Sequence, residues 1–228
     1  AELTGLDIRT APDLIEATSD AGVFMTLSGT LKRAAVKLSK ICNDLRLLSS
    51  GPQAGFGEIN LPARQAGSSI MPGKVNPVIP EVVNQVAFAV IGSDATVTAA
   101  SEAGQLQLNA FEPIIASSLM QSLVWLTNAC KTLRLNCIDG ITANEDRLRQ
   151  MVEESVGVVT ALTPYIGYVK SAAIAHEALA GGGTVRELVI AQGLMDEAEL
   201  DSVLSPQRLS GLSLATGIIL LPPVDEDQ

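Results

Sequence analysis

The chain has 228 residues, a length that fits one large domain or one and a half. Nearly half of its residues are apolar (47%) but only 3% are aromatic, so the sequence predicts a sizeable aliphatic core of packed helices. The formal net charge of −10 argues against a nucleic-acid partner, for which a basic stripe is expected. A small anionic substrate is not excluded, because a local loop can be positive on an acidic protein.

The cysteines and the apolar segments predict a soluble, cytoplasmic protein. Its cysteines are Cys42, Cys130 and Cys137. They are odd in number and lack metal-ligand spacing, so we expect buried reduced thiols and no metal site. The first residues have neither a basic region nor an apolar run, so we expect no signal peptide. Polar side chains interrupt the apolar stretch 82–97, at Asn84, Gln85 and Asp94. We therefore expect no membrane partner.

A long helix is predicted from Asp20 to Leu48. Its apolar residues alternate spacings of four and three, which is the seam of a bundle helix. The seam consists of Leu27, Leu31, Ala34, Leu38, Ile41, Leu45 and Leu48. Gly51 and Pro52 end this helix.

Residues 51–80 follow with almost no periodicity, and an insert of this length is usually functional. The stretch from Gly67 to Glu81 reads GSSIMPGKVNPVIPE, and its glycines and prolines predict a loop and exclude a helix or a central strand. Free backbone N–H groups beside Lys74 and Asn76 would suit a carboxylate. The same composition also fits a polar linker between helices.

Two more long helices are predicted after this loop. The first opens at Ile79-Pro80-Glu81, and its apolar residues cover nearly the whole circumference: Val82, Val83, Val86, Phe88, Ala89, Val90 and Ile91. We expect it to be buried on most sides, partly by other chains. Residues 104–109 interrupt the helical run, and Glu112-Pro113 opens the next helix. Its seam is Ile115, Leu119, Leu123, Leu126, Cys130 and Leu133.

Beyond Gly140 the predicted helices become short. Two capping boxes are expected, one joining Thr142 to Glu145 and one joining Thr184 to Glu187. The sequence therefore predicts an all-α fold. Residues 1–140 form a long-helix bundle with a loop at 67–77, residues 141–212 a small helical C-terminal domain, and residues 213–228 a tail.

The loop resembles the signature of the aspartase/fumarase superfamily, whose members eliminate ammonia, water or an amine from succinyl-type substrates. Four other segments resemble the family as well: 16–20 (EATSD), 49–52 (SSGP), 104–109 (GQLQLN) and 140–144 (GITAN). The residues at 105–109 and at 127–130 (TNAC) resemble the aspartate ammonia-lyase branch more than class II fumarase. The resemblance covers nearly the whole chain and corresponds to the C-terminal half of the longer family chains.

The resemblance implies a role for each polar residue of the loop. Ser68 matches the catalytic base, which takes a proton from the carbon beside a carboxylate and leaves an aci-carboxylate dianion. Ser69 matches a neighbour that holds the carboxylate next to the reacting carbon, and Lys74 and Asn76 match the residues that bind the other carboxylate. Glu81 matches a carboxylate that orients a histidine of a neighbouring chain; it also fits a first-turn acid stabilised by the helix dipole.

The family resemblance implies a cofactor-free carbon–nitrogen lyase acting on a small dicarboxylate, in a homotetramer whose active sites combine several chains. The region that would carry the substrate-binding histidine is absent, so we expect this chain to be inactive alone. His176, the only histidine, is interpreted as a plain helix-face residue. Class II fumarate hydratase remains an alternative, as does a catalytically incomplete helical assembly module.

Overall fold

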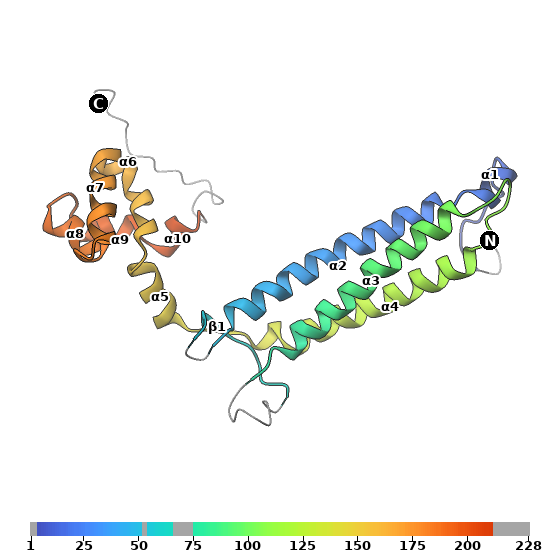
Figure 1. Ribbon diagram of the computed structural model, residues 1–228, viewed down its shortest axis with the longest axis horizontal. Coiled ribbons are helices and arrows are strands. Elements are labelled where there is room, and N and C mark those ends of the chain that lie inside the picture. Colours follow the sequence, from blue (N-terminus) through green and yellow to red (C-terminus); the bar gives the residue numbers. More distant parts are fainter. Residues whose placement is uncertain (1–3, 52–53, 66–74, 212–228) are drawn as a thin grey trace. The chain divides into compact units, whose positions relative to one another are not determined.

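The computed structural model describes residues 4–51, 54–65 and 75–211 (Figure 1). The chain divides into two compact units, Ala1–Asn144 and Glu145–Gln228. Helices dominate both, which confirms the all-α prediction; the strands described are the two-residue β1 (Ile59–Asn60) and β2 (Thr142–Ala143), an antiparallel pair. The sequence places the domain boundary after Gly140. Here it falls after Asn144, because β2 pairs with β1 of the first unit.

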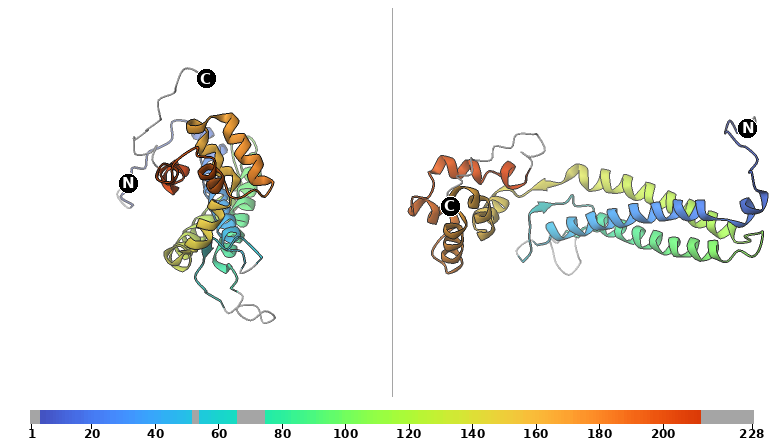
Figure 2. Two further views of the ribbon diagram at one scale, coloured as in Figure 1. Left: turned by 90° about the vertical axis from the view of Figure 1, so that its left-hand side faces the viewer. Right: turned by 90° about the horizontal axis from the view of Figure 1, so that it is seen from above.

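Long antiparallel helices build the first unit. After the short helix α1 (Leu14–Ser19) come α2 (Gly22–Leu48), α3 (Val78–Glu102) and α4 (Glu112–Asn136). Figures 1 and 2 show the three long helices side by side, with α3 packed against both of the others. The short 3-10 helix η1 (Ile138–Gly140) follows α4 and leads into β2. The predicted long-helix bundle is therefore confirmed.

The buried residues of α2 are not the ones that the predicted seam names, and several of them lie one position later in the helix. Its buried positions are small or polar: Ser28, Ala35, Ser39 and Cys42. Leu31, Leu38 and Leu45 are partly buried against the core, as predicted. The prediction was wrong for Leu27, Ala34 and Ile41, which are exposed. Small residues at the contact let the helices approach closely, so the larger side chains one position away remain outside the bundle.

The other two long helices show the same effect. In α4, Ser122 and Ala129 are buried in place of the predicted Leu123 and Cys130, which are exposed. The expectation of three buried thiols was thus wrong for Cys130, whereas Cys42 and Cys137 are buried. The predicted burial of α3 on most sides is not met within one chain, because Val82, Phe88 and Ile91 are exposed.

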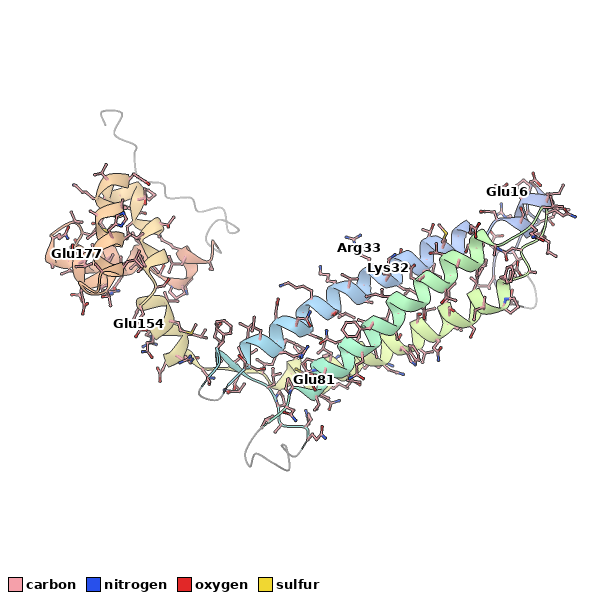
Figure 3. The ribbon with its side chains drawn as sticks, in the orientation of Figure 1. Glu16, Lys32, Arg33, Glu81, Glu154 and Glu177 are labelled. Atoms are coloured by element: carbon pink, nitrogen blue, oxygen red, sulfur yellow. The ribbon has the colours of Figure 1, made fainter. Side chains whose placement is uncertain are left out.

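Buried polar side chains link α2 to the middle of α3. The carboxylate of Asp94 accepts hydrogen bonds from Ser28 Oγ, at 2.8 Å, and from Lys32 Nζ. Lys32 lies on the α2 side of the bundle in Figure 3. Burial by itself raises the pKa of Asp94, but the hydrogen bonds from Lys32 and Ser28 and the charge of Lys32 lower it overall below its ordinary 3.8.

Among the described helices, α3 is long and apolar enough to cross a membrane. Its buried Asn84 and Asp94 both bond to side chains of α2, however, which is the arrangement of a bundle core helix.

Two of the family-like segments meet at the far end of the bundle, where α3 turns into α4. Thr18 Oγ1 donates to the carbonyl of Gln107 at 2.6 Å, and Asn109 N–H donates to the carbonyl of Thr18 at 2.8 Å. The buried Asn109 amide also donates to the carbonyls of Ala100 and Ser101. Segments 16–20 and 104–109 therefore close this end of the bundle.

Short helices form the second unit. They are α5 (Glu145–Glu153), η2 (Val156–Leu162), α6 (Thr163–Ile166), α7 (Tyr168–Leu179), α8 (Val185–Ala191), α9 (Glu197–Val203) and α10 (Pro206–Leu209). Leu162, Ile174, Val189 and Leu200 are fully buried in their shared core. His176 lies exposed on α7, as predicted. The predicted tail 213–228 lies outside the described residues.

One predicted capping box is confirmed and the other is wrong. Thr184 Oγ1 accepts from Glu187 N–H, and the Glu187 carboxylate accepts from Thr184 N–H. Thr142 instead lies in β2, and the helix that follows begins only at Glu145. Thr142 is therefore not an N-cap.

We predict that Asp94→Asn lowers the free energy of unfolding by about 1–3 kcal/mol near neutral pH, because it removes a charged hydrogen-bond acceptor. A pKa lowered in the folded state stabilises the fold above the ordinary pKa, and this contribution is lost as the pH falls through the folded value. The difference between Asp94→Asn and the parent should therefore shrink in acid. Urea unfolding between pH 7 and pH 3 measures it.

Asp44→Asn is the matched control, since the exposed Lys40–Asp44 pair lies on the same helix as Lys32. We expect a change below about 0.5 kcal/mol. Equal effects of the two substitutions would contradict the assignment of Asp94 as a buried link.

Candidate functional site

The candidate site lies at the start of α3, and only part of it is described. Ser68, Ser69 and Lys74 lie outside the described residues, so their roles stay predictions. Asn76 is half-buried two residues before the helix, and its carbonyl accepts from Val78 N–H at 2.8 Å. Glu81 is half-buried in the first turn of α3 and is labelled in Figure 3. The structure thus places Asn76 and Glu81 at the same helix terminus.

An apolar cluster supports this end of the bundle, and we call it the terminal cluster. Its buried members come from all three long helices and the cap of α4: Cys42, Val83, Ala129, Leu133 and Cys137. Leu61, which precedes the signature loop, packs against it, as does Ile79, which follows the loop. Both flanks of the loop are therefore held by one cluster.

The side chain of Asn84 fixes the start of α3 against α2. Its amide nitrogen donates to the carbonyl of Ser39 at 3.1 Å, to Ser39 Oγ at 2.8 Å and to Asn43 Oδ1 at 3.1 Å. Its oxygen accepts from Arg46 Nη1 at 3.4 Å. Asn84 is buried and lies about one helical turn after Glu81, so this network determines where the first turn of α3 lies.

The buried thiols near the site are not activated. Burial raises the pKa of Cys42 to about 11, with a further rise from Cys137. Burial also raises the pKa of Cys137, and the Arg64 charge offsets part of that rise. A thiol is nucleophilic only as a thiolate, so neither is poised for covalent chemistry. Among the described residues no group of three or more His, Cys, Asp or Glu side chains is placed to hold a metal ion.

Comparison with known proteins identifies the family. The family model described as "Lyase" matches residues 1–92, and the one described as "Fumarase C C-terminus" matches residues 158–211. The aspartate ammonia-lyase of Pseudomonas canavaninivorans is 61% identical over 209 residues, which cover 92% of this chain and 44% of that enzyme. The chain belongs to the aspartase/fumarase superfamily. Within the superfamily it is most like aspartate ammonia-lyase.

Solved structures agree with the superfamily assignment. A Brucella melitensis structure described as "fumarate lyase:delta crystallin", bound to cobalt, has a TM-score of 0.85 and 55% identity, covering 92% of this chain and 45% of that one. A class II fumarase from Schistosoma mansoni has a TM-score of 0.81 and 33% identity, covering 89% of this chain and 42% of that one. The chain therefore spans less than half the length of these superfamily members.

Sequence reasoning missed two residues whose hydrogen bonds lie close to the described part of the site, Asn84 and Arg64. Asn84 was noted only as a polar interruption of an apolar helix, and Arg64 was not singled out at all. The available signal for Asn84 was its position, because a carboxamide there interrupts a helix whose apolar pattern predicts burial. Arg64 had no such signal, because its partners lie in residues 135 and 136.

We predict that Asn84→Ala lowers the free energy of unfolding by about 1–3 kcal/mol, because its removal breaks a buried set of hydrogen bonds. Asn43→Ala, which removes an exposed member of the same network, should cost less than about 1 kcal/mol. Urea unfolding of the two variants measures the difference. A larger loss for Asn43→Ala than for Asn84→Ala would contradict the central role of Asn84.

Proposed function

We propose that this chain is part of a carbon–nitrogen lyase that removes ammonia from L-aspartate to give fumarate. The observation that carries the proposal is its 57–61% identity to several aspartate ammonia-lyases over 92% of its length. Class II fumarate hydratase has weaker support, since the Schistosoma mansoni fumarase is 33% identical. The chain covers 44% of the Pseudomonas canavaninivorans enzyme, so the activity is proposed for the assembled whole and not for this part alone.

The chemistry assigns a separate task to each loop residue. Elimination begins with removal of a weakly acidic proton beside a carboxylate, so the aci-carboxylate dianion must be stabilised as it forms. Ser68 is the proposed base, and an ordinary serine acts as one only if backbone N–H groups and positive charge stabilise its oxyanion. Ser69 holds the carboxylate next to the reacting carbon. Lys74 and Asn76 hold the other carboxylate, by charge and by directed N–H donation respectively.

The location of Asn76 and Glu81 supports this division of tasks. Both lie at the N-terminal end of a 25-residue helix, whose dipole favours negative charge nearby. A bound carboxylate beside Asn76 would gain from this field. The same field stabilises the carboxylate of Glu81. The task proposed for this carboxylate is to orient a histidine of a neighbouring chain.

A homotetramer with composite active sites is the proposed assembly, and the exposed apolar residues of the bundle support it. They include Val82, Phe88 and Ile91 on α3 and Met120, Leu123 and Val124 on α4. Such side chains on neighbouring long helices are typical of a surface that another chain covers. The proposed enzyme acts on a small dicarboxylate without a cofactor and is cytoplasmic.

We predict that residues 1–228 alone give no measurable fumarate from aspartate. Activity should appear in a chimera that joins this chain to the part of the Pseudomonas canavaninivorans enzyme preceding the match, because the missing site residues are then supplied. Fumarate absorbance with aspartate, and separately with malate, measures the outcome. Turnover of malate but not aspartate would favour the hydratase, and turnover by the 228-residue chain alone would contradict the composite site. A well-folded chimera without either activity would favour the assembly module.

We predict that Ser68→Ala in this chimera lowers kcat by about a hundredfold or more with KM little changed, because the base is lost while the carboxylate contacts remain. Lys74→Ala should also raise KM, since its charge contacts substrate and transition state alike. Steady-state kinetics on the two variants separates the roles. A Ser68→Ala enzyme within about threefold of the parent would remove Ser68 as the base.

A further inference from the structure

The proposed chemistry leaves the family-like segment 140–144 (GITAN) without a task. The segment begins at the last residue of η1 and runs through β2, and in the structure it contacts residues 57–62, which lie about eighty residues earlier in the chain. Those residues lead into the signature loop. We propose that Gly140, Asn144 and Arg64 are positioning residues that clamp residues 57–65 and thereby fix where the chain enters the signature loop. This inference rests on the proposed function.

Asn144 holds the beginning of the clamped segment. Its backbone N–H donates to the carbonyl of Glu58 at 2.9 Å, and its amide nitrogen donates to the carbonyl of Gly57 at 2.7 Å. Asn60 Nδ2 in turn donates to Asn144 Oδ1 at 2.6 Å. These bonds lie beside the β1–β2 pair, so a single asparagine after β2 is bonded both to β1 and to the residues that precede it.

Gly140 provides the space for the middle of the segment. A Cβ atom at this position would lie 2.7 Å from Cγ of Pro62, closer than such atoms approach in proteins. This Cγ belongs to a ring closed on the backbone, so it can shift by a change of ring pucker but cannot rotate away as the end of a flexible side chain could. A larger residue at position 140 would therefore force Pro62 or the end of η1 to shift, and the neighbouring Leu61 packs on the terminal cluster.

Arg64 anchors the end of the segment to α4. Its Nε donates to the carbonyl of Asn136 at 2.9 Å, and its Nη2 donates to the carbonyl of Leu135 at 3.2 Å. These carbonyls belong to the last turn of α4, where no further helical N–H follows and where the helix dipole favours a cation. The forked guanidinium satisfies two of them at once, which a lysine cannot do in the same geometry.

The anchor at Arg64 matters because Ser68 is only four residues further on. One residue adds at most about 3.6 Å of chain, so fixing Arg64 limits the volume that Ser68 can occupy. Asn76 and α3 limit it from the other flank, through Ile79 on the same terminal cluster. A base misplaced by about 1 Å can lose a hundredfold in rate. The clamp would therefore act on kcat without touching substrate.

The activity test uses the chimera described above. We expect Arg64→Ala to lower kcat by about ten- to a hundredfold with a small change in Tm, and Arg64→Lys to be intermediate. The matched control is Arg134→Ala, which removes an exposed arginine near the same helix end that pairs with Asp139 at 3.4 Å. It should leave kcat unchanged. Equal kcat for Arg64→Ala and the parent would overturn the role of Arg64.

A steric rescue tests the contact at Gly140. Gly140→Ala should lower kcat by a similar factor, and adding Pro62→Ala should restore most of it, because the ring atom that meets the new Cβ is gone. Pro62→Ala alone should have a small effect. A Gly140→Ala chimera with parental kcat, or a double variant no better than Gly140→Ala, would overturn the proposed contact.

Hydrogen exchange on the 228-residue chain separates failure of the clamp from failure of the proposed function. The N–H groups of Gly57 and Glu58 donate to the carbonyls of Ser50 and Leu48, and these amides should exchange at least tenfold faster in Arg64→Ala and Gly140→Ala than in the parent. Unchanged exchange in both variants overturns the clamp, whatever the activity of the chimera. If the parent chimera is inactive while exchange responds as expected, the clamp stands and the proposed function fails.

Discussion

The terminal cluster is the contact on which the candidate site depends. It joins α2, α3 and α4 at one end of the bundle through Cys42, Val83 and Leu133, and it receives Leu61 and Ile79 from the two flanks of the signature loop. Burial of aliphatic side chains stabilises this junction but is non-directional, so it does not fix the register of the helices. The distance between the two flanks is therefore set by core packing, in which a change of one methylene group is felt.

The buried polar side chains on α3 fix the register of this helix against α2. Asn84 bonds to Ser39 and Asp94 bonds to Ser28, at nearly the same separation along the two antiparallel helices. An apolar seam of small residues and leucines repeats every heptad, so by itself it permits a shifted register. A shift would leave Asn84 or Asp94 buried without a partner, which costs more than the hydrogen bonds contribute when made. The polar pairs thus select the register, and the apolar seam supplies most of the stability.

The sequence predicted the long helices because their apolar residues keep a spacing of three and four over many turns. It did not predict the phase of the seam, since α2 carries apolar residues on a wider arc than one chain covers: Ala35 is buried, whereas Ile41 is exposed. The amino-acid sequence of the loop indicated Ser68 and Lys74 as site residues, through its resemblance to the family. The contacts of the proposed clamp could not be predicted, because Arg64 donates to carbonyls more than seventy residues away.

The exposed apolar arc and the proposed chemistry favour the same assembly. An aci-carboxylate dianion is stabilised best where water is excluded, because fixed donors and charges act more strongly at low dielectric. Glu81 and Asn76, at the start of α3 in a single chain, are only half-buried. Neighbouring copies packed along Phe88 and Ile91 of α3 would remove those side chains from water and close the site with the same contact. Burial of the apolar arc would then stabilise the proposed assembly, while Asn84 and the proposed clamp would hold the residues on either side of the signature loop.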